Sequence, residues 1–169
     1  FDPDPILAEA EDADMIGNCH AVEADGYSGT GYADGFNVAD DENTEENEAD
    51  GITFHVEIEQ SGFYDLNFVT KSSSHKENKV WVDNEEAGVV AAESDLELQD
   101  SILELVYLEK GSHEISYYAY WGYVQVDCLK LTGSEPLPAD LYETKAELCN
   151  PNATEETKAL YAYLREIYG

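Results

Sequence analysis

Hydrophobic and polar residues alternate with a period of two through the middle of the chain. Residues 52–58 place Ile52, Phe54, Val56 and Ile58 on one face, and similar stripes recur at 64–68, 80–82, 103–107, 115–119 and 124–128. Successive side chains of a strand point to opposite faces, so each stripe indicates a half-buried strand. Turn residues such as Ser61-Gly62 separate the stripes. Short strands at this spacing predict an all-β fold, a β-sandwich, whose core includes Phe54, Tyr64, Phe68 and Tyr117.

Two segments interrupt the alternation. The stretch Asp40–Asp50 holds seven acidic residues in eleven and is predicted to be a solvated loop. It lacks the glycine and the ligand spacing of an EF-hand. Residues 72–75 form a second, polar loop between strands.

The C-terminal part of the chain has a different pattern. Residues 133–140 form a proline-containing linker, and an apolar stripe at helical spacing follows Thr154, a suitable N-cap. We therefore divide the chain into a sandwich over 1–133 and a linker with one short α-helix over 134–169. The helix either packs on the sandwich or begins a domain that follows it.

Charge narrows the choice of partners. The formal net charge is −30, with 38 acidic and 8 basic side chains. No basic stripe is present to replace phosphate counterions, which excludes ordinary nucleic-acid binding and disfavours anionic membranes. The charge favours cations and neutral ligands. No apolar run approaches the ~18 residues of a membrane span. No signal-peptide pattern opens the chain, so we expect Phe1 to begin a mature or trimmed secreted chain.

The three cysteines, at positions 19, 128 and 149, include no CxxC pair, which disfavours a thiolate metal site. One disulfide with one free thiol and three free thiols both remain open.

Motifs of catalysis are missing from the sequence. The segment Gly26-Tyr27-Ser28-Gly29-Thr30 departs from G-x-S-x-G at its last position, and no HExxH motif or P-loop occurs. The four histidines have no metal-ligand spacing. A pair of carboxylates for glycoside hydrolysis cannot be singled out among 38 acids. We therefore assign no catalytic residue and expect no enzymatic activity.

Two carboxylates near the start suggest a cation site. On an extended strand Glu9 and Glu11 share one face, while Ala8 and Ala10 take the other. Calcium prefers six to eight oxygen ligands, and the glycine-rich segment 26–31 can fold back to offer carbonyls. Asp127, placed among apolar residues, could supply a third carboxylate. Acidic side chains on an exposed strand face explain the pattern equally well.

Aromatic residues near the end of the predicted sandwich suggest a sugar platform. Sugar recognition needs flat aromatic faces with polar groups beside them. Trp121 and Tyr123 flank Gly122 at a predicted loop, and Tyr32, Asp34 and Phe36 form a second mixed cluster. Most aromatics of a sandwich belong to its core, and Tyr117 is assigned there.

In combination these motifs resemble the family 35 carbohydrate-binding modules, close relatives of family 6. The matching segments are Ala8–Ala13, Gly26–Tyr32, Asp34–Phe36, Ser61–Tyr64 and Val124–Leu131, within residues 6–133. The resemblance implies a jelly roll with structural calcium, held by Glu9, Glu11, Asp127 and carbonyls near Ser28. It also implies a ligand site in loops at one end of the sandwich, which here comprises Tyr32, Asp34, Phe36, Lys71, His75, Trp121 and Tyr123. Family members that bind uronic acids carry an asparagine where this chain has Trp121-Gly122-Tyr123, so we expect a neutral glycan.

The tail carries a second resemblance. Residues 145–164 are similar to the opening helix of glycoside hydrolase family 26, which consists mainly of β-mannanases. This implies a catalytic barrel after residue 169 in the same parent chain and a β-mannan ligand, glucomannan or galactomannan. The alternatives are another neutral glycan, such as α-galactosyl branches or xylan, a small β-sandwich enzyme, and a structural spacer.

Overall fold

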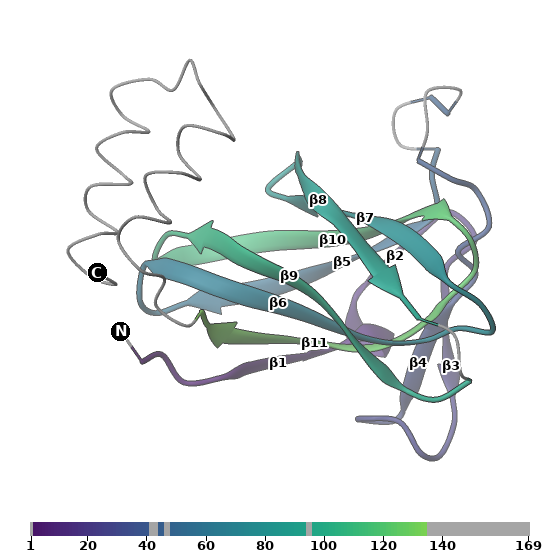
Figure 1. The fold of residues 1–169 in the computed structure, drawn as a ribbon, viewed down its shortest axis with the longest axis horizontal. Helices are drawn as coiled ribbons and strands as arrows, with labels where there is room; N and C mark the ends of the chain where they lie inside the picture. The colour runs from purple at the N-terminus through teal and green to yellow at the C-terminus, as the bar shows by residue number, and fades with distance from the viewer. Residues whose placement is uncertain (1, 41–43, 46–47, 94–95, 135–169) are drawn as a thin grey trace.

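Two antiparallel sheets pack face to face in the computed structural model, which describes residues 2–40, 44–45, 48–93 and 96–134 (Figure 1). Within these ranges the chain forms β1 (Ile6–Glu9), η1 (Ala10–Asp12), β2 (Asp14–Ile16), β3 (His20–Glu23), β4 (Gly31–Asp34), β5 (Gly51–Ile58), β6 (Gly62–Lys71), β7 (Lys76–Val82), β8 (Glu85–Ala92), β9 (Gln99–Leu108), β10 (Gly111–Trp121) and β11 (Gln125–Gly133). The predicted β-sandwich is therefore confirmed. Cys149, the predicted helix and the linker beyond Ser134 lie outside the described residues.

The six-stranded sheet has the order β3-β4-β11-β6-β9, with β1 also paired to β11. The five-stranded sheet has the order β2-β5-β10-β7-β8. One edge of β11 is shared, because β4 pairs with it at Val126 and β1 pairs with it from Cys128 to Leu131. In the part of the chain that the structure covers, no helix is long and apolar enough to cross a membrane.

The core lies between the sheets and is built from alternate residues of their strands. The four aromatic residues predicted there are all buried: Phe54, Tyr64, Phe68 and Tyr117. The ring of Phe68 lies 5.0 Å from that of Tyr117 and 6.2 Å from that of Phe54, centroid to centroid. The hydroxyl of Tyr117 accepts a hydrogen bond of 3.0 Å from Nδ2 of Asn78, which satisfies the one polar atom of this buried ring.

Register shifts mark β-bulges in both sheets, one between Val126 and Cys128 and one between Ala119 and Trp121. A bulge inserts one extra residue, so two consecutive side chains can point to the same side of a sheet. The alternation in the sequence predicted Cys128 on the core face with Val126. That prediction is wrong, because the core cluster contains Val126 and Leu129 but not Cys128.

The acidic segment Asp40–Asp50 ends in a buried residue rather than in solvent. The side chain of Asp50 is only 1% exposed. It accepts backbone hydrogen bonds from Asn18 (2.7 Å), Asn37 (2.9 Å) and Val38 (2.7 Å). Burial alone would raise the pKa of Asp50, but these donors outweigh it and hold the pKa below the ordinary value of 3.8. The prediction of a solvated loop is therefore wrong at this residue. Its hydrogen bonds hold two loops against the start of β5.

Cys19 and Cys128 are free thiols, and both are buried. Burial is the main cause that raises the pKa of each to about 12. Nearby carboxylates raise it further, those of Asp50 and Asp34 at Cys19 and those of Asp127, Glu9 and Glu11 at Cys128. Both therefore stay protonated and unreactive at neutral pH.

Candidate functional site

The two N-terminal carboxylates are brought together by a short turn rather than by a continuous strand. The predicted extended segment ends early, because β1 stops at Glu9 and Glu11 lies in the 3-10 helix η1. The fully buried Ala10 anchors this turn in the core. Both carboxylates nevertheless reach the glycine-rich loop 26–31.

This loop folds over three acidic side chains. The Oγ of Ser28 donates to Glu9 Oε1 (2.7 Å), and the backbone N–H of Ser28 donates to Asp127 Oδ1 (2.8 Å). The backbone N–H of Thr30 donates to Glu11 Oε1 (2.6 Å). Gly29 has a φ of +57°, and a Cβ there would lie 2.3 Å from Glu11 Oε1. The four residues predicted to form a cation site, Glu9, Glu11, Ser28 and Asp127, therefore lie together.

Two carboxylate oxygens of this cluster have no hydrogen-bond donor in the described part of the chain. Glu9 Oε2 and Glu11 Oε2 are buried without a hydrogen-bond partner among the residues described. Buried polar atoms are normally paired, and an unpaired carboxylate oxygen is costly. Burial raises the pKa of Asp127, and the carboxylates of Glu9 and Glu11 raise it further, against a lowering hydrogen bond from Ser28 and the charge of Lys130. Such a site fits a cation.

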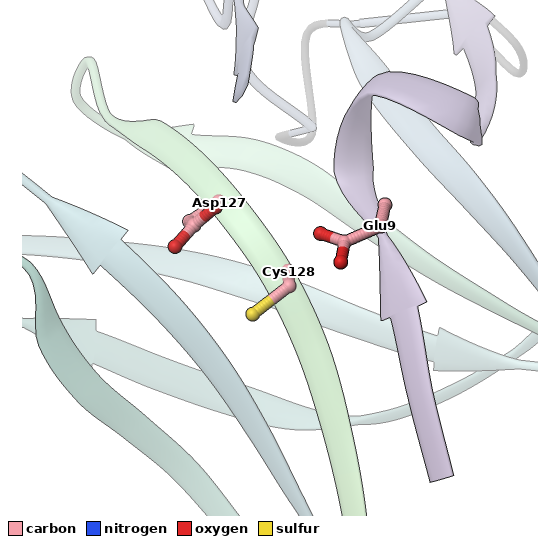
Figure 2. Close-up of side chains that lie close together, drawn as sticks. All are labelled: Glu9, Asp127 and Cys128. Carbon is pink, nitrogen blue, oxygen red and sulfur yellow. The ribbon is translucent and has the colours of Figure 1, made fainter. Parts of the chain in front are cut away.

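The chemistry of the donors favours a hard cation. Oxygens of Glu9 and Asp127 and the Sγ of Cys128 all lie within 4.8 Å of one another (Figure 2). Calcium takes carboxylate, carbonyl and hydroxyl oxygens, which the acids and the loop supply. The thiol of Cys128, with its raised pKa, is a poor ligand for such an ion.

At one end of the sandwich, the loop that joins β10 to β11 presents two exposed aromatic rings. The side chains of Trp121 and Tyr123 are 61% and 65% exposed and flank Gly122. The stem of Lys76 crosses this glycine, where a Cβ would lie 2.0 Å from Lys76 Cδ. The ring of His75 lies 6.0 Å from that of Trp121, centroid to centroid. We call Trp121, Tyr123 and His75 the loop platform.

A second aromatic pair lies at the start of β11. The ring of Tyr27 packs 4.5 Å from that of Tyr32, and Nζ of Lys71 lies 5.9 Å from the centroid of Tyr27. The hydroxyl of Tyr27 donates to Oε1 of Gln125 at 2.7 Å. Of these four neighbours, Tyr32 and Lys71 were predicted from the sequence as candidate ligand residues, but Tyr27 and Gln125 were not. The glycines around Tyr27 were a signal, since they indicate a tight loop that displays the residues between them.

Phe36, predicted to contact the ligand, lies in the core instead. Phe36 is only 1% exposed and packs edge to face on Tyr117, with centroids 5.6 Å apart. It belongs to the core and offers no ring to a ligand, so that prediction is corrected. Asp34 is half-buried, and its Oδ1 accepts a hydrogen bond from the N–H of Gly35 (2.8 Å), which holds the carboxylate against its own loop.

Comparison with protein families matches residues 6–134 to the carbohydrate binding module (family 35). The chain belongs to this family. The module is therefore a non-catalytic carbohydrate-binding domain, which confirms the resemblance on which the predicted function was based.

Similar proteins extend beyond the module itself. The chain is 33% identical over 162 residues to a mannan endo-1,4-beta-mannosidase of Thermothelomyces thermophilus, covering 95% of this chain and 31% of that protein. It is 29% identical to mannan endo-1,4-beta-mannosidase B of Piromyces sp., covering 97% and 28%. The chain thus spans about a third of the length of these relatives.

Solved structures agree with the fold. A GH26-CBM35 β-(1,4)-mannanase of Podospora anserina matches with a TM-score of 0.66 and 28% identity, over 96% of this chain and 34% of that one. A family 35 module of Clostridium thermocellum matches with a TM-score of 0.63 and 20% identity, over 78% of this chain and 100% of that one.

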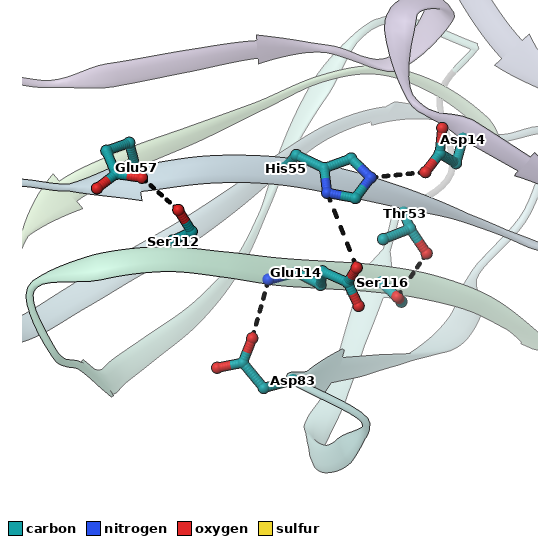
Figure 3. Close-up of polar contacts among 8 residues, drawn as sticks. All are labelled: Asp14, Thr53, His55, Glu57, Asp83, Ser112, Glu114 and Ser116. Carbon is teal, nitrogen blue, oxygen red and sulfur yellow. Dashed lines mark hydrogen bonds and ion pairs between the residues drawn. The ribbon is translucent and has the colours of Figure 1, made fainter.

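Away from its loops, the module carries a network of polar side chains on the outer face of the five-stranded sheet (Figure 3). Thr53 and Ser116 share a hydrogen bond of 2.7 Å across β5 and β10. The Nε2 of His55 lies 2.6 Å from Asp14 Oδ2, and its Nδ1 lies 3.9 Å from Glu114 Oε1. These contacts pair the polar side chains over this part of the face.

His113 follows Ser112 on β10 but takes the opposite side of the strand, opposite Val56, and is expected to make the stability of the module depend on pH. Its Nδ1 lies 2.6 Å from Asp83 Oδ2, and its Nε2 lies 2.6 Å from the carbonyl oxygen of Glu109. Burial would lower the pKa of His113, but the Glu109 carbonyl and the Asp83 carboxylate outweigh it and raise the pKa above 6.5. The stabilisation is therefore complete below the unfolded pKa of His113 and is lost as pH rises through the higher folded pKa.

We expect His113→Gln to lower the free energy of unfolding at pH 5 and to have little effect at pH 9. Asp83 is half-exposed, so screening limits the effect to about 1 kcal/mol. Urea unfolding at both pH values measures it, with the exposed His20→Gln as the control. An equal loss at the two pH values would assign His113 a packing role instead.

Proposed function

We propose that this module binds β-mannan, glucomannan or galactomannan, for a glycoside hydrolase domain of the same secreted polypeptide. The observation that carries the proposal is the loop platform, two largely exposed aromatic rings on a module of this family. The relatives named mannan endo-1,4-beta-mannosidase support the choice of polysaccharide. The similarity to the Thermothelomyces protein covers 95% of the chain and so extends into the tail, which supports a hydrolase partner.

A neutral polysaccharide fits the physical character of the site. The apolar face of a sugar ring stacks on an aromatic face, and hydroxyls need polar groups beside it. His75 lies beside Trp121, Lys76 crosses Gly122 between the two exposed rings, and Gln125 contacts Tyr27 of the second aromatic pair. All three side chains can exchange such hydrogen bonds. The net charge of −30 repels negatively charged polyuronates. Salt weakens this repulsion beyond the Debye length but not at close approach.

Calorimetric titration with galactomannan, glucomannan, xylan, an α-galactosyl oligosaccharide and polygalacturonate tests this assignment. We expect binding to both mannans, with an affinity that barely changes between low and high salt. Binding to xylan or to the α-galactosyl oligosaccharide alone would replace mannan with another neutral glycan. Preference for polygalacturonate would overturn the proposal of a neutral ligand.

We further propose that calcium occupies the acidic cluster as a structural ion. Glu9, Glu11 and Asp127 would be its carboxylate ligands, helped by oxygens of the loop near Ser28. The ion would neutralise converging negative charge and tie the end of β1 and the loop 26–31 to β11. Because the loop also carries Tyr27, its order would extend to the aromatic pair that Tyr27 forms with Tyr32.

The isolated module is expected to release no reducing sugar from mannan, xylan or pectin, because it belongs to a family of carbohydrate-binding modules and its sequence carries no catalytic motif. A reducing-end assay with purified protein over a day measures this, with a commercial mannanase as the positive control. Steady turnover that tracks with the protein through two chromatographic steps would contradict it.

A further inference from the structure

The outer face of the five-stranded sheet carries aromatic rings that do not belong to the core. Trp81 on β7 and Tyr118 on β10 are half-buried there, and Tyr120 is 38% exposed. Register places Ser116 beside Trp81 and Tyr118 beside Lys79, so these residues are neighbours on one face. We call Trp81, Tyr118 and Tyr120 the sheet track.

A glycine on the neighbouring strand makes room for the central ring of this track. Gly51 of β5 pairs with Tyr118 of β10, and a Cβ on Gly51 would lie only 2.5 Å from Tyr118 Cδ1. The ring therefore lies over Gly51, in the space that a side chain would otherwise fill. On its other side the Trp81 ring meets it nearly edge-on, at 6.2 Å and 78°. A glycine inside a strand weakens the strand and often marks a position that something approaches closely.

The bulge in β10 joins the sheet track to the loop platform. Ala119 points into the core, whereas the next two residues, Tyr120 and Trp121, are both exposed. Side chains two residues apart on one face of a strand are separated by about 7 Å. Tyr118 and Tyr120 therefore lie on one face of β10, and Trp121 follows Tyr120 at the end of the strand.

Polar groups accompany the rings along the track. The Nζ of Lys79 lies 4.8 Å from the centroid of Tyr120 and 3.8 Å from Asp40 Oδ2. The same Asp40 oxygen accepts a hydrogen bond of 3.2 Å from the indole N–H of Trp81. Further along β10 the face is hollowed between His55, Asp83 and Glu114. Ring faces bordered by both donors and acceptors suit a chain of neutral sugars, whereas the carboxylates disfavour an anionic polymer.

We infer that a polysaccharide bound at the loop platform continues along β10 over the sheet track, so that one long chain contacts both. This inference rests on the proposed binding of β-mannan. Its consequence is that affinity rises with chain length beyond what the platform alone can contact. Short oligosaccharides use the platform, and only longer ones reach Tyr118.

Calorimetric titration with manno-oligosaccharides of increasing length tests the inference. Tyr118→Ala and the exposed Tyr120→Ala should leave the affinity for the shortest binding oligosaccharide unchanged. Both should weaken the longest about tenfold, the loss of roughly one stacked ring. Trp121→Ala should weaken all lengths. Ile102→Ala, an exposed residue of the other sheet, is the control, and melting curves identify any variant that fails to fold.

The outcomes separate this inference from the proposed function. If the wild-type affinity does not change with length, or both tyrosine variants bind long chains normally, the sheet track is no part of the site, although mannan binding stands. If the wild-type module binds manno-oligosaccharides of no length, the proposed function itself fails. If tyrosine substitution weakens only the longer chains, both are supported.

Discussion

Removing divalent cations with EDTA is expected to destabilise the module by about 4 kcal/mol, relative to calcium at a thousandfold excess over its Kd. Without the ion, the carboxylates of Glu9, Glu11 and Asp127 repel one another, and two buried oxygens have no partner. For a domain of this size the loss corresponds to about 10 °C in Tm. Differential scanning calorimetry of dialysed protein, with and without added calcium, measures it.

A substitution tests the same ion without a chelator. Glu11→Gln keeps the size of the side chain but removes one charge from the cluster, so most of the calcium-dependent rise in Tm should disappear. Glu104→Gln, an exposed acid of β9, is the matched control and should keep the full rise. If neither EDTA nor Glu11→Gln changes the melting curve, the cluster holds no structural cation.

Trp121→Ala is expected to weaken mannan binding about thirtyfold or more. Losing a stacked aromatic anchor costs roughly 2 kcal/mol or more, and each 1.4 kcal/mol is about tenfold in Kd. The fold should survive, because the Trp121 side chain is 61% exposed and adds little to the core. Isothermal titration with galactomannan oligosaccharides gives the ratio of the dissociation constants directly.

Two variants make the Trp121 result specific. Trp121→Phe keeps a flat ring and should recover most of the affinity, whereas Ile102→Ala removes an exposed apolar side chain elsewhere and should have no effect. A Trp121→Ala protein that binds normally but melts early would show that this residue supports the fold and that the sugar binds elsewhere.

Alternation in the sequence was enough to predict the sandwich and its core. Phe54 and Tyr117 lie on regular strands, where each step of two residues returns to the same face, so their burial follows from local pattern alone. The structure also places Glu9, Glu11 and Asp127 around one loop, and their role as ligands stays a prediction. For these the information came from combined motifs and their resemblance to a family, since separation along the chain does not reveal proximity in space.

The errors arose where backbone geometry departs from regular alternation. The bulge at Asp127 shifts the register of β11, so Cys128 leaves the face predicted from its position. Phe36 follows Gly35, whose φ of +97° turns the chain and directs the ring inward. Asp50 is buried because backbone donors from two distant loops converge on it. Such long-range contacts leave no periodic signal in a sequence.

Alkylation of the two buried thiols can measure how often the structure around each of them opens. With pKa values of about 12 and almost no exposure, Cys19 and Cys128 are shielded from alkylating reagents while the sandwich stays closed. Each modification event therefore records an opening of the structure around that sulfur. Cys128 lies beside the acidic cluster, whereas Cys19 lies near the buried carboxylate of Asp50. The ratio of their labelling rates distinguishes local loosening at β11 from unfolding of the whole domain, without any engineered cysteine.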